Sequence, residues 1–121
     1  MIKIMIAEDQ QLIRESLKII LNSIEGLRVI SIVANGEEVL QQLENEKPDI
    51  ILMDFRMPVM DGVESTRVLK QRYPDVHVLM LTTFNDDEYV LKALAYGASG
   101  YILKGISLRE LKYSIETTVE G

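Results

Sequence analysis

Short apolar stretches alternate with longer amphipathic stretches along the chain, and the alternation occurs five times. The short stretches are rich in β-branched and aliphatic residues, which is typical of strands that are buried on both faces. They are Ile2–Ile6, Val29–Val33, Ile50–Met53, Val76–Leu81 and Gly100–Leu103. The second stretch has the most polar surroundings, because Arg28 precedes it and Ser31 lies within it. We therefore expect this strand at an edge of the sheet.

Between these stretches, apolar residues recur at the spacing of an amphipathic helix. The stripes are Leu12, Ile13, Leu17, Ile20, Leu21 and Ile24; Val39, Leu40 and Leu43; Val63, Val68 and Leu69; Leu91, Leu94 and Ala95; and Leu108, Leu111, Ile115 and Val119. Four expected helix starts have a capping residue three positions before a Glu, as in a capping box. These pairs are Asn35 and Glu38, Asp61 and Glu64, Asn85 and Glu88, and Ser107 and Glu110. Gly26 and Gly97 indicate where two helices end.

The alternation predicts an α/β fold, a (βα)5 unit with a doubly wound, parallel five-stranded sheet and helices on both faces. The length of 121 residues suits one ordinary domain, so we expect a single domain over residues 1–121. A net charge of −6 argues against nucleic-acid binding by this domain, because such binding needs a basic surface.

The absence of cysteine excludes disulfides, thiol catalysis and cysteine metal sites. No apolar run approaches the roughly 20 residues of a membrane-spanning helix. The N-terminal apolar run meets Glu8 and Asp9 too early to be a signal peptide. We therefore expect a cytoplasmic domain without membrane contact.

Polar residues lie where four of the five expected strands end. They are Glu8 and Asp9 after the first strand, Asp54 at the end of the third, Thr82 and Thr83 after the fourth, and Lys104 after the fifth. Ligands of open parallel sheets bind at these carboxyl ends. Converging carboxylates repel one another and are neutralised by a hard cation, and Mg²⁺ commonly bridges to phosphate oxygens. Lys104 offers a positive charge and Thr82 a hydroxyl donor to such oxygens.

Groups for turning over a substrate are not evident. The only histidine, His77, lies inside an expected strand, and no glycine-rich phosphate loop follows the first strand. A metal-dependent phosphohydrolase with an aspartyl nucleophile is one alternative, but its leaving-group acid would stand where this chain has Arg56. A flavin-binding module is another, although Glu8 and Asp9 would repel a flavin phosphate. A stand-alone interaction domain is a third.

The ordered set of motifs resembles the receiver domain of bacterial two-component response regulators. The set covers essentially the whole chain and comprises Glu8-Asp9, Asp54 with Met57-Pro58 and Asp61-Gly62, Thr82, Tyr101 and Lys104. The resemblance implies a flavodoxin-like fold with strand order 2-1-3-4-5. It also implies that the domain is a phosphoacceptor switch rather than an enzyme. Such a switch takes its phosphoryl group from a sensor histidine kinase.

The resemblance assigns a role to each matching residue. Asp54 is the phosphoacceptor, and Lys104 pairs with the phosphoryl oxygens. Asp9, Asp54 and the backbone carbonyl of Arg56 are Mg²⁺ ligands, with Glu8 acting nearby through a water. Glu8 departs from the family, which more often has Asp at this position.

Further residues are expected to respond to phosphorylation or to tune it. Thr82 moves toward the phosphoryl group, and Tyr101 turns inward as Thr82 vacates space. Arg56 and Phe84 flank the site and are expected to set the phosphoryl lifetime by controlling water access. Gly105 stands where many receivers have Pro after a cis peptide bond, and the sequence leaves the geometry of the Lys104–Gly105 bond open.

The stretches 81–89 and 95–105 resemble the NarL/LuxR subgroup. Members of that subgroup usually carry a C-terminal helix-turn-helix that binds promoters. The resemblance therefore implies that this chain is the N-terminal part of a longer transcription regulator. It also implies that DNA is contacted only through a C-terminal domain absent from this chain, and that phosphorylation favours a homodimer.

Overall fold

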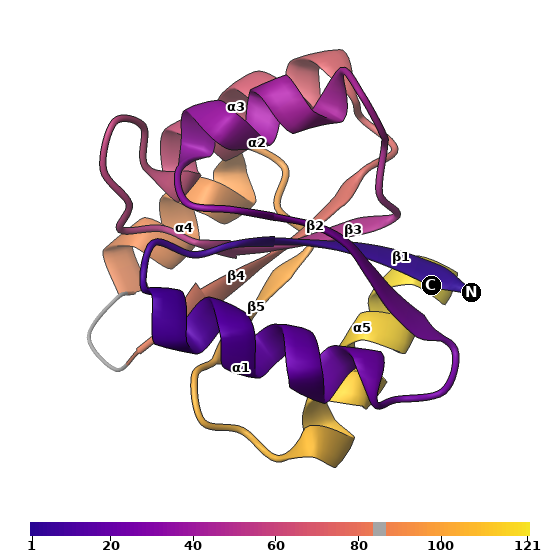
Figure 1. The fold of residues 1–121 in the computed structure, drawn as a ribbon. Coiled ribbons are helices and arrows are strands. Elements are labelled where there is room, and N and C mark those ends of the chain that lie inside the picture. Colours follow the sequence, from indigo (N-terminus) through magenta and orange to yellow (C-terminus); the bar gives the residue numbers. More distant parts are fainter. Residues whose placement is uncertain (84–86) are drawn as a thin grey trace.

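A computed structural model describes residues 1–83 and 87–121, and within them strands and helices alternate along the chain (Figure 1). The strands are β1 (Ile2–Ala7), β2 (Leu27–Val33), β3 (Ile50–Asp54), β4 (His77–Thr82) and β5 (Gly100–Leu103). The helices are α1 (Gln11–Asn22), α2 (Gly36–Leu43), α3 (Gly62–Arg72), α4 (Asp87–Ala95) and α5 (Leu108–Glu120). The expected (βα)5 arrangement is confirmed.

All strands pair in parallel, in the order β2-β1-β3-β4-β5. The expected strand order and the edge position of β2 are therefore confirmed. β2 begins at Leu27 rather than at Val29, because Leu27 is buried and pairs with Ile2 while Arg28 faces solvent. The strand order reverses direction between β1 and β3, so the switch point of the sheet lies between their carboxyl ends.

Two hydrophobic cores lie on opposite faces of the sheet, because alternate strand residues point to opposite sides. Met5 and Met53 face the side covered by α2, α3 and α4, whereas Ile4 and Leu52 face the side covered by α1 and α5 (Figure 1). All four side chains are fully buried. This double burial explains why β1 and β3 read as continuous apolar runs.

Helix α4 buries a different face from the one that its apolar stripe predicts, and α1 buries only part of its stripe. In α4 the buried residues are Val90 and Ala93, whereas Leu91 is 67% exposed and Leu94 is 38% exposed. In α1, the buried residue is Leu21, and Leu12 is 77% exposed. The stripes contain more apolar residues than the sheet can cover, so part of each stripe stays at the surface.

Side-chain caps begin three of the helices as predicted. Asn35, Asp61 and Ser107 each accept a hydrogen bond from the backbone N–H of the Glu three positions later. The fourth pair includes Asn85, which lies outside the described residues. At the end of α4, Gly97 has φ +110° and the Ala98 N–H donates to the Ala93 carbonyl at 3.0 Å, as in a Schellman motif.

Gly26 has φ +90° but lies beyond Ser23, the residue that caps the end of α1. It therefore belongs to the connection to β2 and not to the helix end.

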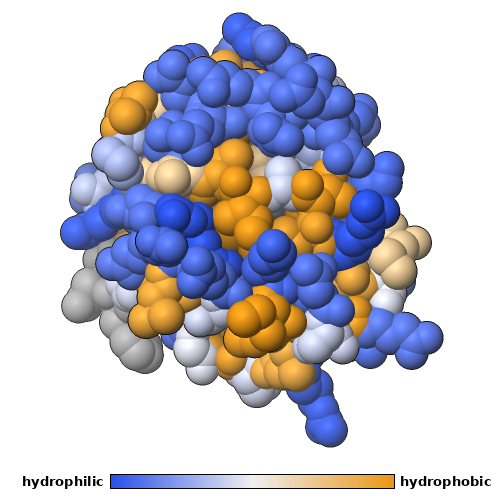
Figure 2. All heavy atoms as spheres, in the orientation of Figure 1, coloured by the Kyte–Doolittle hydropathy of each residue, from blue (hydrophilic) through white to orange (hydrophobic). Residues whose placement is uncertain are grey.

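The open edge of the sheet is partly apolar. Figure 2 shows hydrophobic side chains gathered across the middle of the face where β2 runs in Figure 1, and Val29, Ile30 and Ile32 of this strand are half-buried. Within the part of the chain that is described, no helix has both the length and the apolar character needed to cross a membrane.

Candidate phosphoacceptor and metal site

The acidic pair Glu8 and Asp9 follows β1 directly. The Glu8 N–H donates to the Val33 carbonyl of β2 at 3.1 Å, and the Glu8 side chain is fully buried while Asp9 is exposed. Arg14 of α1 donates from Nη1 to the carbonyl oxygens of Glu8 and Asp9, at 3.0 Å in each case. Arg14 therefore ties the acidic loop to the helix that follows it.

Sequence reasoning did not identify Arg14 as a site residue. The available signal was an Arg in the first turns of a helix that begins directly after two acids. A guanidinium group in that position can reach back to the loop carbonyls.

Asp54 is the last residue of β3, at the switch point of the sheet, and is 6% exposed. The chain turns sharply after it. The Gly62 N–H donates to the Phe55 carbonyl at 2.9 Å, and a Cβ at Gly62 would lie only 2.2 Å from the Asp54 carbonyl oxygen. The start of α3 thus packs directly against the backbone of Asp54 and fixes its position.

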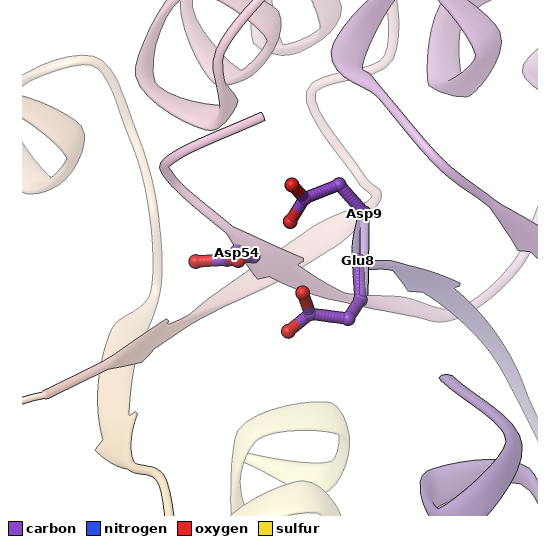
Figure 3. Close-up of side chains that lie close together, drawn as sticks. All are labelled: Glu8, Asp9 and Asp54. Atoms are coloured by element: carbon purple, nitrogen blue, oxygen red, sulfur yellow. The ribbon is translucent and has the colours of Figure 1, made fainter. Parts of the chain in front are cut away.

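The three carboxylates predicted from the sequence converge. One oxygen from each of Glu8, Asp9 and Asp54 lies within 4.8 Å of the others. Figure 3 shows the carboxyl groups projecting to the same side, two from the end of β1 and one from the end of β3. Hard divalent cations prefer such oxygen ligands, so the donor set fits Mg²⁺.

Lys104 closes the site from β5. Its side-chain Nζ lies 3.0 Å from Glu8 Oε1 and 3.4 Å from Asp54 Oδ2. The backbone N–H of Lys104 donates to the Thr82 carbonyl at 2.7 Å. Burial opposes the charged ammonium group, but pairing with Glu8 and the charge of Asp54 outweigh burial, and the pKa of Lys104 is raised. The side chain therefore stays cationic beside Asp54.

The pKa of Asp9 is raised above its ordinary value. Partial burial is the largest cause, and a hydrogen bond with the Glu8 side chain and the charge of Glu8 add to it. Lys104 acts in the opposite direction with a smaller effect. Burial and the neighbouring Glu8 carboxylate thus disfavour the negative charge of Asp9, and a bound cation would favour it.

The two expected switch residues lie on neighbouring strands. Thr82 is the last residue of β4 and is 2% exposed, and its hydroxyl donates to the Ile102 carbonyl at 3.4 Å. Tyr101 on β5 is 53% exposed, so its ring lies at the surface in this conformation. Gly105 has φ +92°, and no peptide bond among the described residues is cis.

The side chain of Arg56, one of the two expected tuning residues, lies over aromatic rings. Its guanidinium carbon is 5.6 Å from the ring centroids of both Phe55 and Tyr89. Phe84, the other expected tuning residue, lies outside the described residues. Tyr89 was not identified from the sequence, because its contact with the loop after β3 depends on how α4 packs.

The chain matches the response regulator receiver domain family over residues 4–116. It is 45% identical to the transcriptional regulatory protein LnrK of Bacillus subtilis (strain 168), a match that covers 100% of this chain and 55% of the relative. It is 42% identical to the transcriptional regulatory protein DegU of Brevibacillus brevis, over 99% of this chain and 51% of the relative.

Solved structures agree with these sequence relatives. A two-component response regulator of the LuxR family from Aurantimonas sp. SI85-9A1 matches with a TM-score of 0.91 and 30% identity, over 99% of this chain and 86% of that one. The response regulator domain of Thermotoga maritima CheB matches with a TM-score of 0.90 and 26% identity, over 99% and 97% of the two chains.

The chain spans about half the length of the curated relatives it matches. The family match covers nearly all of it, and the acidic cluster lies at the switch point of the sheet. The chain therefore belongs to the response regulator receiver domain family, with LuxR-family regulators among its structural relatives.

Proposed function

We propose that this receiver domain accepts a phosphoryl group on Asp54 from a phosphohistidine of a sensor histidine kinase. The observation that carries the proposal is the placement of Asp54. Its carboxylate lies at the switch point, within an acidic cluster, and one of its oxygens is 3.4 Å from the Lys104 ammonium group. An acid placed in this way combines a nucleophilic oxygen with a countercharge for the incoming group.

The transfer forms one bond and breaks another. An Asp54 carboxylate oxygen attacks phosphorus, the phosphorus–nitrogen bond breaks, and its electron pair returns to the imidazole nitrogen of the donor. Lys104 is close enough to hold a phosphoryl oxygen once the phosphoryl group has been transferred to Asp54. The pairing of Lys104 with the buried Glu8 keeps the ammonium group in place before transfer.

Asp9, Asp54 and the backbone carbonyl of Arg56 would hold Mg²⁺, with Glu8 contributing through a water. Bound Mg²⁺ would supply charge neutralisation to the carboxylates and the phosphoryl oxygens. Support for this part of the proposal comes from the clustering of the carboxylate oxygens and from the raised pKa of Asp9.

An Asp9→Asn variant tests the cation site without relying on phosphorylation. Because the pKa of Asp9 is raised in the folded state, its ionisation costs stability as the pH rises through that pKa, and Asn removes this cost. We expect the metal-free variant to be more stable than wild type at pH 7 by roughly 0.5 kcal/mol, since the side chain is exposed.

Mg²⁺ should stabilise wild type more than the variant. At a tenfold excess over its Kd, the ion should stabilise wild type by about 1.4 kcal/mol, and the variant much less. Thermal unfolding with and without Mg²⁺ measures both effects. Equal stabilisation of the two proteins would remove Asp9 from the ligand set.

Output is proposed to follow from movement of Thr82 toward the phosphoryl group and of Tyr101 inward. Such a change biases a two-state element and alters the surface of α4 and β5. In the full-length protein we propose that this favours a homodimer and regulates transcription through a C-terminal DNA-binding domain, in the cytoplasm. The names of the relatives LnrK and DegU as transcriptional regulatory proteins support the proposal.

The direct test is incubation with a small phosphodonor and Mg²⁺, followed by intact mass measurement and site mapping. We expect one phosphoryl group per chain, on the peptide that contains Asp54, and no incorporation when the Mg²⁺ is chelated. A label on another residue would contradict the assignment. Continuous turnover of a phosphomonoester would instead favour the phosphohydrolase alternative.

A Lys104→Met variant should lose both transfer and stability. Phosphorylation should slow by about a hundredfold, because a preorganised countercharge is removed. The fully buried Glu8 carboxylate would lose its ion-pair partner, which should cost about 2 kcal/mol after allowance for the partial exposure of Lys104. Phosphorylation kinetics and urea unfolding measure the two effects.

Lys47→Met is a matched control for this variant. Lys47 pairs with Asp75 at 2.7 Å, but both side chains are largely exposed, so we expect a loss below about 0.5 kcal/mol. If the two variants lost equal stability, Lys104 would not be acting on a buried charge.

A further inference from the structure

Two aromatic rings connect the segment after Asp54 to helix α4. Phe55 directly follows the proposed phosphoacceptor, and its side chain is 4% exposed. Its ring stacks on that of Tyr89, with centroids 4.9 Å apart and an angle of 16° between the planes. Tyr89 lies in the first turn of α4 and is 38% exposed, so one part of its ring remains at the surface.

The guanidinium group of Arg56 lies over both rings. Its central carbon is 5.6 Å from each centroid, within the range of a cation–π contact. Arg56 is also the residue whose backbone carbonyl is proposed to face the metal and whose side chain is proposed to tune the phosphoryl lifetime. Phe55, Arg56 and Tyr89 together form an aromatic cluster.

The two rings that contact the Arg56 guanidinium group are anchored in separate parts of the fold. Phe55 is anchored through its backbone, because its carbonyl accepts from the Gly62 N–H at 2.9 Å. Tyr89 is anchored in α4, whose residues Val90 and Ala93 are buried against the sheet. The position of Arg56 beside the acceptor therefore depends on a residue from a distant part of the chain.

We infer that Tyr89 is a positioning residue for the phosphorylated state: its ring, stacked on Phe55, holds Arg56 over the loop after β3 and so slows hydrolysis of the phosphoryl group on Asp54. The inference rests on the proposed function. Without the Tyr89 ring, Arg56 loses one of its two aromatic contacts and Phe55 loses its stacking partner. The segment next to Asp54 then moves more freely, and water reaches the phosphorus more often.

The lifetime of the phosphoryl group tests this role. The protein is phosphorylated with a small phosphodonor, the donor is removed, and loss of the phosphoryl mass is followed with time. Tyr89→Leu should shorten the lifetime by about threefold, the size expected for loss of a surface cation–π contact. Tyr89→Phe keeps the aromatic ring and should have the wild-type lifetime. Tyr113→Leu, at an exposed tyrosine of α5, is the control and should leave the lifetime unchanged.

A double-mutant cycle with Arg56→Met separates positioning from simple destabilisation. If Tyr89 acts through Arg56, Tyr89→Leu has no further effect on the lifetime in the Arg56→Met background. An equal effect in both backgrounds, or a wild-type lifetime in Tyr89→Leu, overturns the inference while leaving the proposed function in place. A wild-type protein that takes no phosphoryl group on Asp54 overturns both.

Discussion

An Asp54→Asn variant is expected to take up no phosphoryl group from a phosphodonor and to keep its fold. The amide lacks the nucleophilic carboxylate oxygen, but it has the size of the original side chain. Its carbonyl oxygen can still accept from Lys104, which lies 3.4 Å from Asp54 Oδ2 in the wild type. Lys104 also keeps its stronger contact with Glu8, at 3.0 Å.

Stability should change little, because two effects oppose each other. The substitution weakens an ion pair with Lys104, but it also removes one of the clustered carboxylates that repel one another. We expect a net change within about 1 kcal/mol. Circular dichroism and urea unfolding would establish that lost incorporation is not the result of lost folding.

Asp75→Asn is a suitable control for Asp54→Asn. Asp75 lies before β4, at the opposite end of the strands from the acidic cluster, and pairs with Lys47 at the surface. Intact mass measurement should show normal incorporation in this variant. Equal incorporation into Asp54→Asn and wild type would exclude Asp54 as the acceptor.

The fold could be predicted well because the deciding signals are local in sequence. Each strand is a short apolar run, and the caps at Asn35, Asp61 and Ser107 lie three positions before the residues they bind. The convergence of Glu8, Asp9 and Asp54 followed from a general rule, since the carboxyl ends of neighbouring parallel strands share one edge.

The parts that could not be predicted depend on contacts between distant segments. Which face α4 buries is decided by the sheet and its neighbouring helices, so Val90 and Ala93 are covered and Leu91 is not. The stack between Phe55 and Tyr89 likewise requires the packed position of α4. For Lys104, a contact with the phosphoryl oxygens was expected, whereas its pairing with the buried Glu8 was not.

A Gly62→Ala variant is expected to lose about 3 kcal/mol of stability, although alanine is the better helix former. The added Cβ would lie 2.2 Å from the Asp54 carbonyl oxygen and 2.8 Å from Phe55 Cα. Both neighbours belong to the backbone at the end of β3, so they cannot rotate away. Either α3 or the segment that carries Asp54 must shift, and urea unfolding measures the loss of stability.

The same displacement should impair the site, because moving the backbone of Asp54 separates its carboxylate from Asp9 and Lys104. We therefore expect weaker Mg²⁺ binding and slower phosphorylation of the folded fraction of Gly62→Ala. Gly100→Ala is the matched control: its Cβ would meet only the Leu79 side chain, at an ordinary 3.5 Å. This control should stay within about 1 kcal/mol of wild type. If the two variants unfolded at the same urea concentration, close packing of α3 against Asp54 would not be what requires glycine at position 62.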